Sequence, residues 1–145
     1  NYDAVEILFA EDSIDDATLT IRALVKSGFT NKLYHVKDGA EALDFIYCRG
    51  MYASRNINEK PKLILLDLKM PKLTGMEVLE KIKSDPNFKS IPVVILTSSN
   101  EDPDVQKCYA LGANSYIVKP VDSDNFFNAI KEIGMYWVII NQPQH

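Results

Sequence analysis

Short apolar runs that alternate with amphipathic stretches constrain the fold of this chain more than any other feature. Four of these runs have the length and composition of strands buried on both faces, and they span residues 5–10, 63–66, 92–96 and 115–118. A fifth and weaker run, at residues 32–36, alternates apolar and polar side chains and suits the edge of a sheet. Strands of this kind, each followed by a helix, predict a parallel sheet with right-handed crossovers.

Helical patterns follow each of these runs. They span residues 15–27, 40–49, 74–84 and 102–111, and a last one runs from a cap at Asp122 or Ser123 to about Val138. Residues 50–62 show no periodicity, which predicts a long surface loop. The fold class is therefore α/β: a doubly wound (βα)5 arrangement around a five-stranded parallel sheet, with helices on both faces.

The length of 145 residues suits one domain and is too short for two ordinary ones. We expect a single domain over residues 1–145, with a core at about 4–138 and a short tail at 139–145. The first residue is not a methionine, so we expect the chain to begin inside a longer gene product or to lack its first residues. The apolar run at 135–140 is far too short to span a bilayer.

Charge and cysteine content narrow the functional classes. The net charge of −4 disfavours a general role in nucleic-acid binding. Cys48 and Cys108 lie far apart, outside any CxxC spacing, and are expected to be reduced thiols in a cytosolic protein. These features predict a cytoplasmic protein that binds neither membrane nor nucleic acid.

Polar residues that can do chemistry follow the predicted strands. Glu11 and Asp12 follow the first strand, Asp67 the third, Thr97 the fourth and Lys119 the last. Because ligands bind outside the carboxyl ends of the strands in open α/β sheets, these side chains are expected to meet at one edge. Each has an ordinary structural explanation on its own, such as a helix cap or a solvated turn. Together, and in this order, they favour a site.

Such a site can carry out phosphoryl chemistry. Crowded carboxylates favour a hard cation, and Mg²⁺ is usually held by one or two carboxylates together with water and phosphate oxygens. An ionised Asp67 is already a nucleophile and needs no general base to attack phosphorus. Lys119 can contact a carboxylate or a phosphoryl oxygen, and the Thr97 hydroxyl can donate a hydrogen bond to the same phosphoryl group.

Four sequence stretches resemble one known family. They lie at residues 7–13 (Ile-Leu-Phe-Ala-Glu-Asp-Ser), 65–75 (Leu-Leu-Asp-Leu-Lys-Met-Pro-Lys-Leu-Thr-Gly), 93–99 (Val-Val-Ile-Leu-Thr-Ser-Ser) and 112–120 (Gly-Ala-Asn-Ser-Tyr-Ile-Val-Lys-Pro). Through them the chain resembles the CheY-like receiver domains of response regulators, over about residues 5–133. Its long loop and apolar C-terminal helix most resemble the small response regulators paired with cyanobacterial and bacterial phytochromes.

The resemblance implies roles for particular residues. Asp67 is the expected phosphoacceptor. For Mg²⁺, Asp12 is expected to be a direct ligand, Glu11 to act mainly through water, and the backbone carbonyl of Lys69 to complete the set with Asp67. The Lys69 side chain is also expected either to hinder the attacking water and slow loss of the phosphoryl group, or to be an ordinary solvated lysine.

Further implications concern the switch. Thr97 and Lys119 are expected to bind the phosphoryl oxygens, and Tyr116 matches the aromatic switch position. Gly75 is expected to let the loop after Asp67 turn tightly, and the Lys119–Pro120 bond matches a cis peptide of the family. Phosphorylation is then expected to reshape the surface of the fourth helix, fifth strand and fifth helix.

The expected function is that of a two-component response regulator. The donor is expected to be a separate histidine kinase, such as a phytochrome, and output to run through protein–protein contacts. The protein is expected not to be an enzyme, beyond catalysing its own phosphorylation and slow self-dephosphorylation. A stripe of Phe126, Ile130, Ile133 and Trp137 along the last helix is expected to pack on the sheet. Apolar side chains that fall off this stripe, including Phe127 and Met135, suggest a homodimer through the C-terminal helix region.

Four alternatives remain at this point. An aspartyl phosphatase of the haloacid dehalogenase type would place a second aspartate where this chain has Lys69. A flavin-binding flavodoxin-like domain would need a phosphate-binding loop in place of Glu11 and Asp12. The chain could be a receiver-like docking module that is not phosphorylated, or a receiver excised from a larger hybrid kinase or regulator.

Overall fold

The computed structural model describes residues 5–28, 33–99 and 102–134. Within these residues five strands form one parallel sheet in the order β2-β1-β3-β4-β5. The strands are β1 (Ile7–Ala10), β2 (Leu33–Val36), β3 (Leu63–Asp67), β4 (Val93–Thr97) and β5 (Ser115–Val118). The five α-helices are α1 (Ile14–Lys26), α2 (Gly39–Ile46), α3 (Gly75–Lys83), α4 (Pro103–Ala110) and α5 (Ser123–Glu132).

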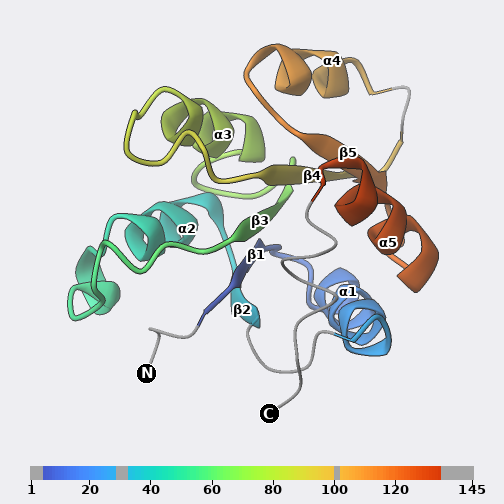
Figure 1. Ribbon diagram of the computed structural model, residues 1–145, viewed down its shortest axis with the longest axis horizontal. Helices are drawn as coiled ribbons and strands as arrows, with labels where there is room; N and C mark the ends of the chain where they lie inside the picture. Colours follow the sequence, from blue (N-terminus) through green and yellow to red (C-terminus); the bar gives the residue numbers. More distant parts are fainter. Residues whose placement is uncertain (1–4, 29–32, 100–101, 135–145) are drawn as a thin grey trace.

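Helices cover both faces of the sheet (Figure 1): α1 and α5 lie on one face, and α2, α3 and α4 lie on the other. Alternate side chains of a strand point to opposite faces, so each strand contributes to two cores. Ile7 and Phe9 of β1 join the core under α1 and α5, whereas Leu8 and Ala10 join the other. The doubly wound α/β fold predicted from the alternation of runs is confirmed.

Burial along the strands follows their place in the sheet. Every residue of β1, β3 and β4 is buried, while β2 and β5 have partly exposed residues because they form the two edges. The edge position predicted for residues 32–36 is confirmed for Leu33–Val36; Lys32 lies outside the described residues.

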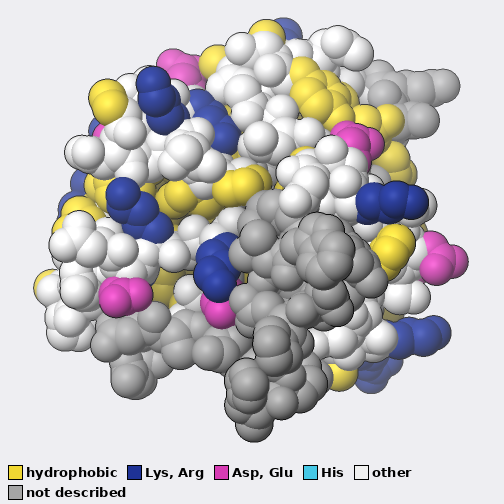
Figure 2. All heavy atoms as spheres, viewed as in Figure 1, with side chains coloured by type: hydrophobic (Ala, Val, Ile, Leu, Met, Phe, Trp, Pro, Cys, Tyr) yellow, Lys and Arg dark blue, Asp and Glu magenta, His cyan; other side chains and the backbone are white. Residues whose placement is uncertain are grey.

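Charged side chains of both signs are scattered over the face seen in Figure 2, with hydrophobic side chains between them. The buried residues of the helices belong to the two cores on either side of the sheet. None of the helices in the described part of the chain is long and apolar enough to cross a membrane.

Two sequence-based predictions need correction. The last helix ends at Glu132 and not near Val138, because Gly134 adopts a φ of 75° there, a conformation that glycine favours and that stops helices. Trp137 and the remaining apolar residues up to 140, together with the predicted tail at 139–145, lie outside the described residues.

The second correction concerns residues 50–62, which are not simply a surface loop. They begin with a 3₁₀ turn, η1 (Gly50–Tyr52), whose Tyr52 is fully buried against the Phe45 ring. Arg55 is also buried; its guanidinium lies 3.9 Å from the Phe45 ring centre and donates to the Phe45 carbonyl. Aromatic and cation–π packing therefore fix the first half of this segment to α2.

Candidate functional site

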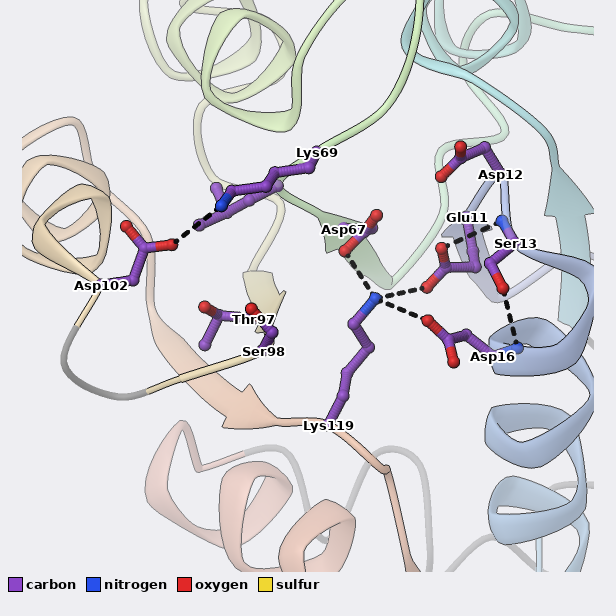
Figure 3. Close-up of a pocket in the computed structure, with 11 residues that line it drawn as sticks. Glu11, Asp12, Ser13, Asp16, Asp67, Lys69, Thr97, Ser98, Asp102 and Lys119 are labelled. Carbon is purple, nitrogen blue, oxygen red and sulfur yellow. Dashed lines mark hydrogen bonds and ion pairs between the residues drawn. The ribbon is translucent and has the colours of Figure 1, made fainter.

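A pocket of about 240 Å³ opens at the carboxyl ends of β1, β3, β4 and β5. Six of the predicted site residues line it: Glu11, Asp12, Asp67, Lys69, Thr97 and Lys119 (Figure 3). Tyr116, the seventh, does not line this pocket. It is partly exposed on β5, where its ring meets Tyr109 of α4 edge-on with ring centres 6.0 Å apart.

Strand register places these side chains together. Asp67 and Thr97 are the last residues of β3 and β4, and Lys119 directly follows β5. The pairing of Asp67 with Leu96, and of Thr97 with Val118, brings the three strand ends level. Residues far apart in the sequence therefore converge on one pocket, as expected for a parallel sheet.

The turn after Asp67 depends on close approach of the backbone. The Gly75 N–H donates to the Leu68 carbonyl at 2.9 Å, so the chain doubles back on itself immediately after the aspartate. A Cβ at Gly75 would lie 2.2 Å from the Asp67 carbonyl oxygen, far inside contact distance. Only glycine fits there.

Lys119 is the electrostatic centre of the pocket. Its Nζ lies 2.9 Å from Asp16 Oδ2, 3.0 Å from Asp67 Oδ1 and 3.3 Å from Glu11 Oε1 (Figure 3). Burial alone would lower the pKa of the lysine, but its bonds to Asp16 and Asp67 and the charges around it raise that pKa above its ordinary value. Lys119 is therefore a permanent cation that offsets part of the carboxylate charge.

Glu11 and Asp67 are two buried carboxyl groups that share the single Lys119 ammonium. Burial raises the pKa of Glu11 from its ordinary 4.5 to about 7, and the charge of Asp67 acts in the same direction. Burial also raises the pKa of Asp67, against the opposing effect of Lys119. Glu11, Asp12 and Asp67 can each offer one oxygen within 4.8 Å of the others, an arrangement that fits a hard divalent cation.

We expect the stability of the metal-free protein to fall as the pH rises from about 4.5 to about 7. In this range an unfolded Glu11 has lost its proton while the folded one keeps it, so ionisation favours unfolding. Glu11→Gln should remove this loss, which amounts to up to about 3 kcal/mol. Urea unfolding across the pH range measures it, and equal pH profiles for the two proteins would contradict the assignment.

Thr97 and Lys69 flank the acidic residues. The Thr97 side chain is almost fully buried, and its hydroxyl donates to the Ser99 carbonyl at 3.1 Å. The Lys69 side chain is largely exposed, and its Nζ lies 3.8 Å from Asp102 Oδ2 (Figure 3). This ion pair links the loop after β3 to the N-terminal cap of α4. The Lys119–Pro120 peptide bond is cis, as the resemblance implies.

Sequence reasoning missed two residues that matter here. Asp16 and Asp102 were predicted only as parts of helix starts, yet both line the pocket. The signal for Asp16 was its position: it lies in the first turn of α1, the helix that begins directly after Glu11, Asp12 and the cap Ser13. For Asp102, which accepts from the Asp104 N–H as the cap of α4, the sequence contains no sign of a contact with Lys69.

Comparison with known proteins gives a consistent result. Residues 7–131 match the family model described as "Response regulator receiver domain". Among curated relatives, the probable methanogenesis regulatory protein FilR2 of Methanothrix harundinacea is 37% identical over 91% of this chain and 83% of its own length. Response regulator Rcp1 of Synechocystis is 38% identical over 91% of this chain and 88% of its own length.

Solved structures agree. The bacteriophytochrome response regulator RtBRR is 46% identical, with a TM-score of 0.86 over 95% of this chain and 82% of its own. The Mn²⁺-bound form of Rcp1 is 36% identical, with a TM-score of 0.73 over 95% of this chain and 96% of its own.

Proposed function

Because the chain belongs to the response regulator receiver domain family, we propose that Asp67 accepts a phosphoryl group from a histidine kinase in two-component signal transduction. Phosphorylation on aspartate is typical of this family. The observation that carries the proposal is the position of the Asp67 carboxylate: it ends β3 inside an acidic pocket, 3.0 Å from the Lys119 ammonium.

The residues of the pocket support this transfer. A carboxylate oxygen of Asp67 bonds to phosphorus while the bond from phosphorus to the kinase histidine nitrogen breaks, and the imidazole leaves with the electron pair. Lys119 already contacts Asp67 Oδ1, so it can contact an oxygen of the attached phosphoryl group. The Thr97 hydroxyl gives up its bond to the Ser99 carbonyl and donates to another phosphoryl oxygen.

We propose that Asp12 and Asp67 ligate Mg²⁺ directly, that Glu11 acts mainly through water, and that the backbone carbonyl of Lys69 completes the set. The cluster of these three carboxylates supports this assignment, as does the Mn²⁺-bound form of the relative Rcp1. When bound, the cation supplies charge neutralisation for the phosphoryl oxygens.

The proposed output is a change of the α4–β5–α5 surface. Thr97 moves toward the phosphoryl group, and Tyr116 turns into the space that this vacates. The Tyr116 ring is partly exposed and meets Tyr109 edge-on, which is consistent with a side chain that has a second position. A receiver domain is not a catalytic enzyme in the usual sense; we propose that this one catalyses only its own phosphorylation and slow self-dephosphorylation.

The test of this function is phosphotransfer. The chain is mixed with an autophosphorylated, ³²P-labelled bacteriophytochrome histidine kinase, with Mg²⁺ or with a chelator. Movement of label to the chain within minutes, only with Mg²⁺, supports the proposal. Label that stays on the kinase with Mg²⁺, when a known receiver takes it up in parallel, contradicts it.

We expect Lys69→Ala to speed loss of the phosphoryl group about two- to fivefold, the rate equivalent of about 0.4 to 1 kcal/mol. Lys69 and Asp102 both line the pocket, and we propose that their ion pair hinders the attacking water. The measurement is the decay of phosphorylated protein after the donor is removed. Lys72→Ala is the matched control, since Lys72 lies on the same loop but pairs with Asp38, outside the pocket. An unchanged rate in Lys69→Ala rules the idea out.

The partners follow from the same proposal. The donor is a phytochrome-class histidine kinase, as the name of RtBRR suggests. We also propose that the 145 residues form a single domain that is cytoplasmic and binds no nucleic acid. A homodimer through the C-terminal helix region is supported within the described residues by the exposed Phe127 on α5. Sedimentation that shows only monomer at micromolar concentration, with and without a phosphoryl analogue, would exclude this dimer.

A further inference from the structure

We infer that Asp16 is a positioning residue: it holds the Lys119 ammonium before phosphorylation and releases it when a phosphoryl group occupies the pocket. The inference rests on the proposed function of Asp67. Three carboxylates share the Lys119 ammonium, and one of them, Asp16, has no role in the phosphoryl chemistry. This arrangement carries the inference.

The hydrogen-bonding capacity of Lys119 is fully used. A lysine ammonium has three N–H donors, and three carboxylates surround Nζ at 2.9 to 3.3 Å. The contact with Asp16 Oδ2 is the shortest of the three (Figure 3). A phosphoryl oxygen can therefore receive a bond from Lys119 only if one carboxylate gives up its own.

Burial decides which carboxylate leaves. The Glu11 side chain is 1% exposed and also accepts from the Ser13 N–H, and the Asp67 side chain, 6% exposed, is the one that carries the phosphoryl group. The Asp16 side chain is 40% exposed. A carboxylate that leaves an ion pair is stabilised by water only if it can reach water, so Asp16 is the residue that gives way.

This release needs no movement of the helix. The Asp16 N–H is held by the Ser13 side chain in the N-terminal cap of α1, and only the carboxylate has to turn. Asp16 thus competes with the phosphoryl group for Lys119, and it lowers the affinity of the pocket for a phosphoryl group.

The test measures binding of beryllofluoride, a noncovalent phosphoryl analogue, by calorimetry with saturating Mg²⁺. We expect Asp16→Asn to lower the Kd about two- to fivefold, because a partly exposed ion pair no longer has to be broken. Asp16→Glu keeps the carboxylate and should return the Kd toward that of the wild type. Asp15→Asn is the matched control: Asp15 lies in the same first turn of α1, is exposed and does not line the pocket.

The outcomes are distinguishable. A tighter Kd in Asp16→Asn alone supports the inference. An unchanged or higher Kd in Asp16→Asn overturns it. An equal decrease of the Kd in Asp15→Asn also overturns it, because the effect would then come only from the loss of one negative charge. If the wild type itself binds no beryllofluoride with Mg²⁺, the proposed function of Asp67 fails, and the inference fails with it.

Discussion

Asp67→Asn is expected to abolish phosphoryl uptake from both a small-molecule donor and a histidine kinase. An amide cannot form the acyl phosphate, and the structure offers no equivalent carboxylate at the end of β3. The substitution should not unfold the protein, because burial already disfavours the charged form of Asp67 and an amide has almost the same shape. Intact-mass spectrometry after incubation with acetyl phosphate and Mg²⁺ measures the uptake.

The matched control for this prediction is Asp124→Asn. Asp124 is an exposed carboxylate in the first turn of α5, away from the pocket, so its loss should leave uptake unchanged. A phosphoryl adduct that survives in Asp67→Asn would mean that the acceptor is another residue. Loss of the adduct in both variants would mean that phosphoryl uptake depends on the overall charge of the protein and not on Asp67 itself.

Gly75→Ala is expected to destabilise the fold by about 3 kcal/mol or more and to lower the melting temperature by about 10 °C. The added Cβ would lie 2.2 Å from the Asp67 carbonyl oxygen, and a backbone atom cannot rotate out of the way as a side chain can. The overlap pushes directly on the residue that carries the proposed nucleophile, so phosphoryl uptake should fall as well. Thermal unfolding followed by circular dichroism measures the stability.

Gly28→Ala separates overlap from backbone strain. Gly28 has a φ of 101°, which alanine tolerates poorly, but an added Cβ there meets nothing within 4 Å. We expect a loss of about 1 kcal/mol from this strain, with normal phosphoryl uptake. If the melting temperature of Gly75→Ala is no lower than that of Gly28→Ala, the close packing of the turn after Asp67 does not contribute to stability as proposed.

The fold was largely predictable because its signals are local. Buried strands are continuous apolar runs, so all five lie within a residue or two of the predicted positions. The errors arose where local and tertiary signals compete. The stripe of Phe126, Ile130 and Ile133 continues to Trp137 in the sequence, but the backbone of Gly134 ends the helix first. A polar residue such as Arg55 is typical of a surface loop, but Arg55 is buried through its contact with Phe45.

The site was predictable as far as it depends on strand ends. Each predicted pocket residue ends or follows a strand, and parallel register alone brings these positions together. Asp16 and Asp102 lie in helix starts, where acidic residues are common for reasons unrelated to a pocket. Their contacts with Lys119 and Lys69 depend on how α1 and α4 pack against the sheet, which periodicity does not specify.

The most direct test of the central claim is to locate the acyl phosphate chemically in the wild-type protein. Phosphorylated chain is treated with borohydride, which reduces an aspartyl phosphate to homoserine, and the peptides are sequenced by mass spectrometry. We predict homoserine at position 67 alone, and only in protein incubated with both donor and Mg²⁺. Homoserine at another aspartate, or phosphorylated protein with position 67 intact, would contradict the assignment of Asp67 as the phosphoacceptor.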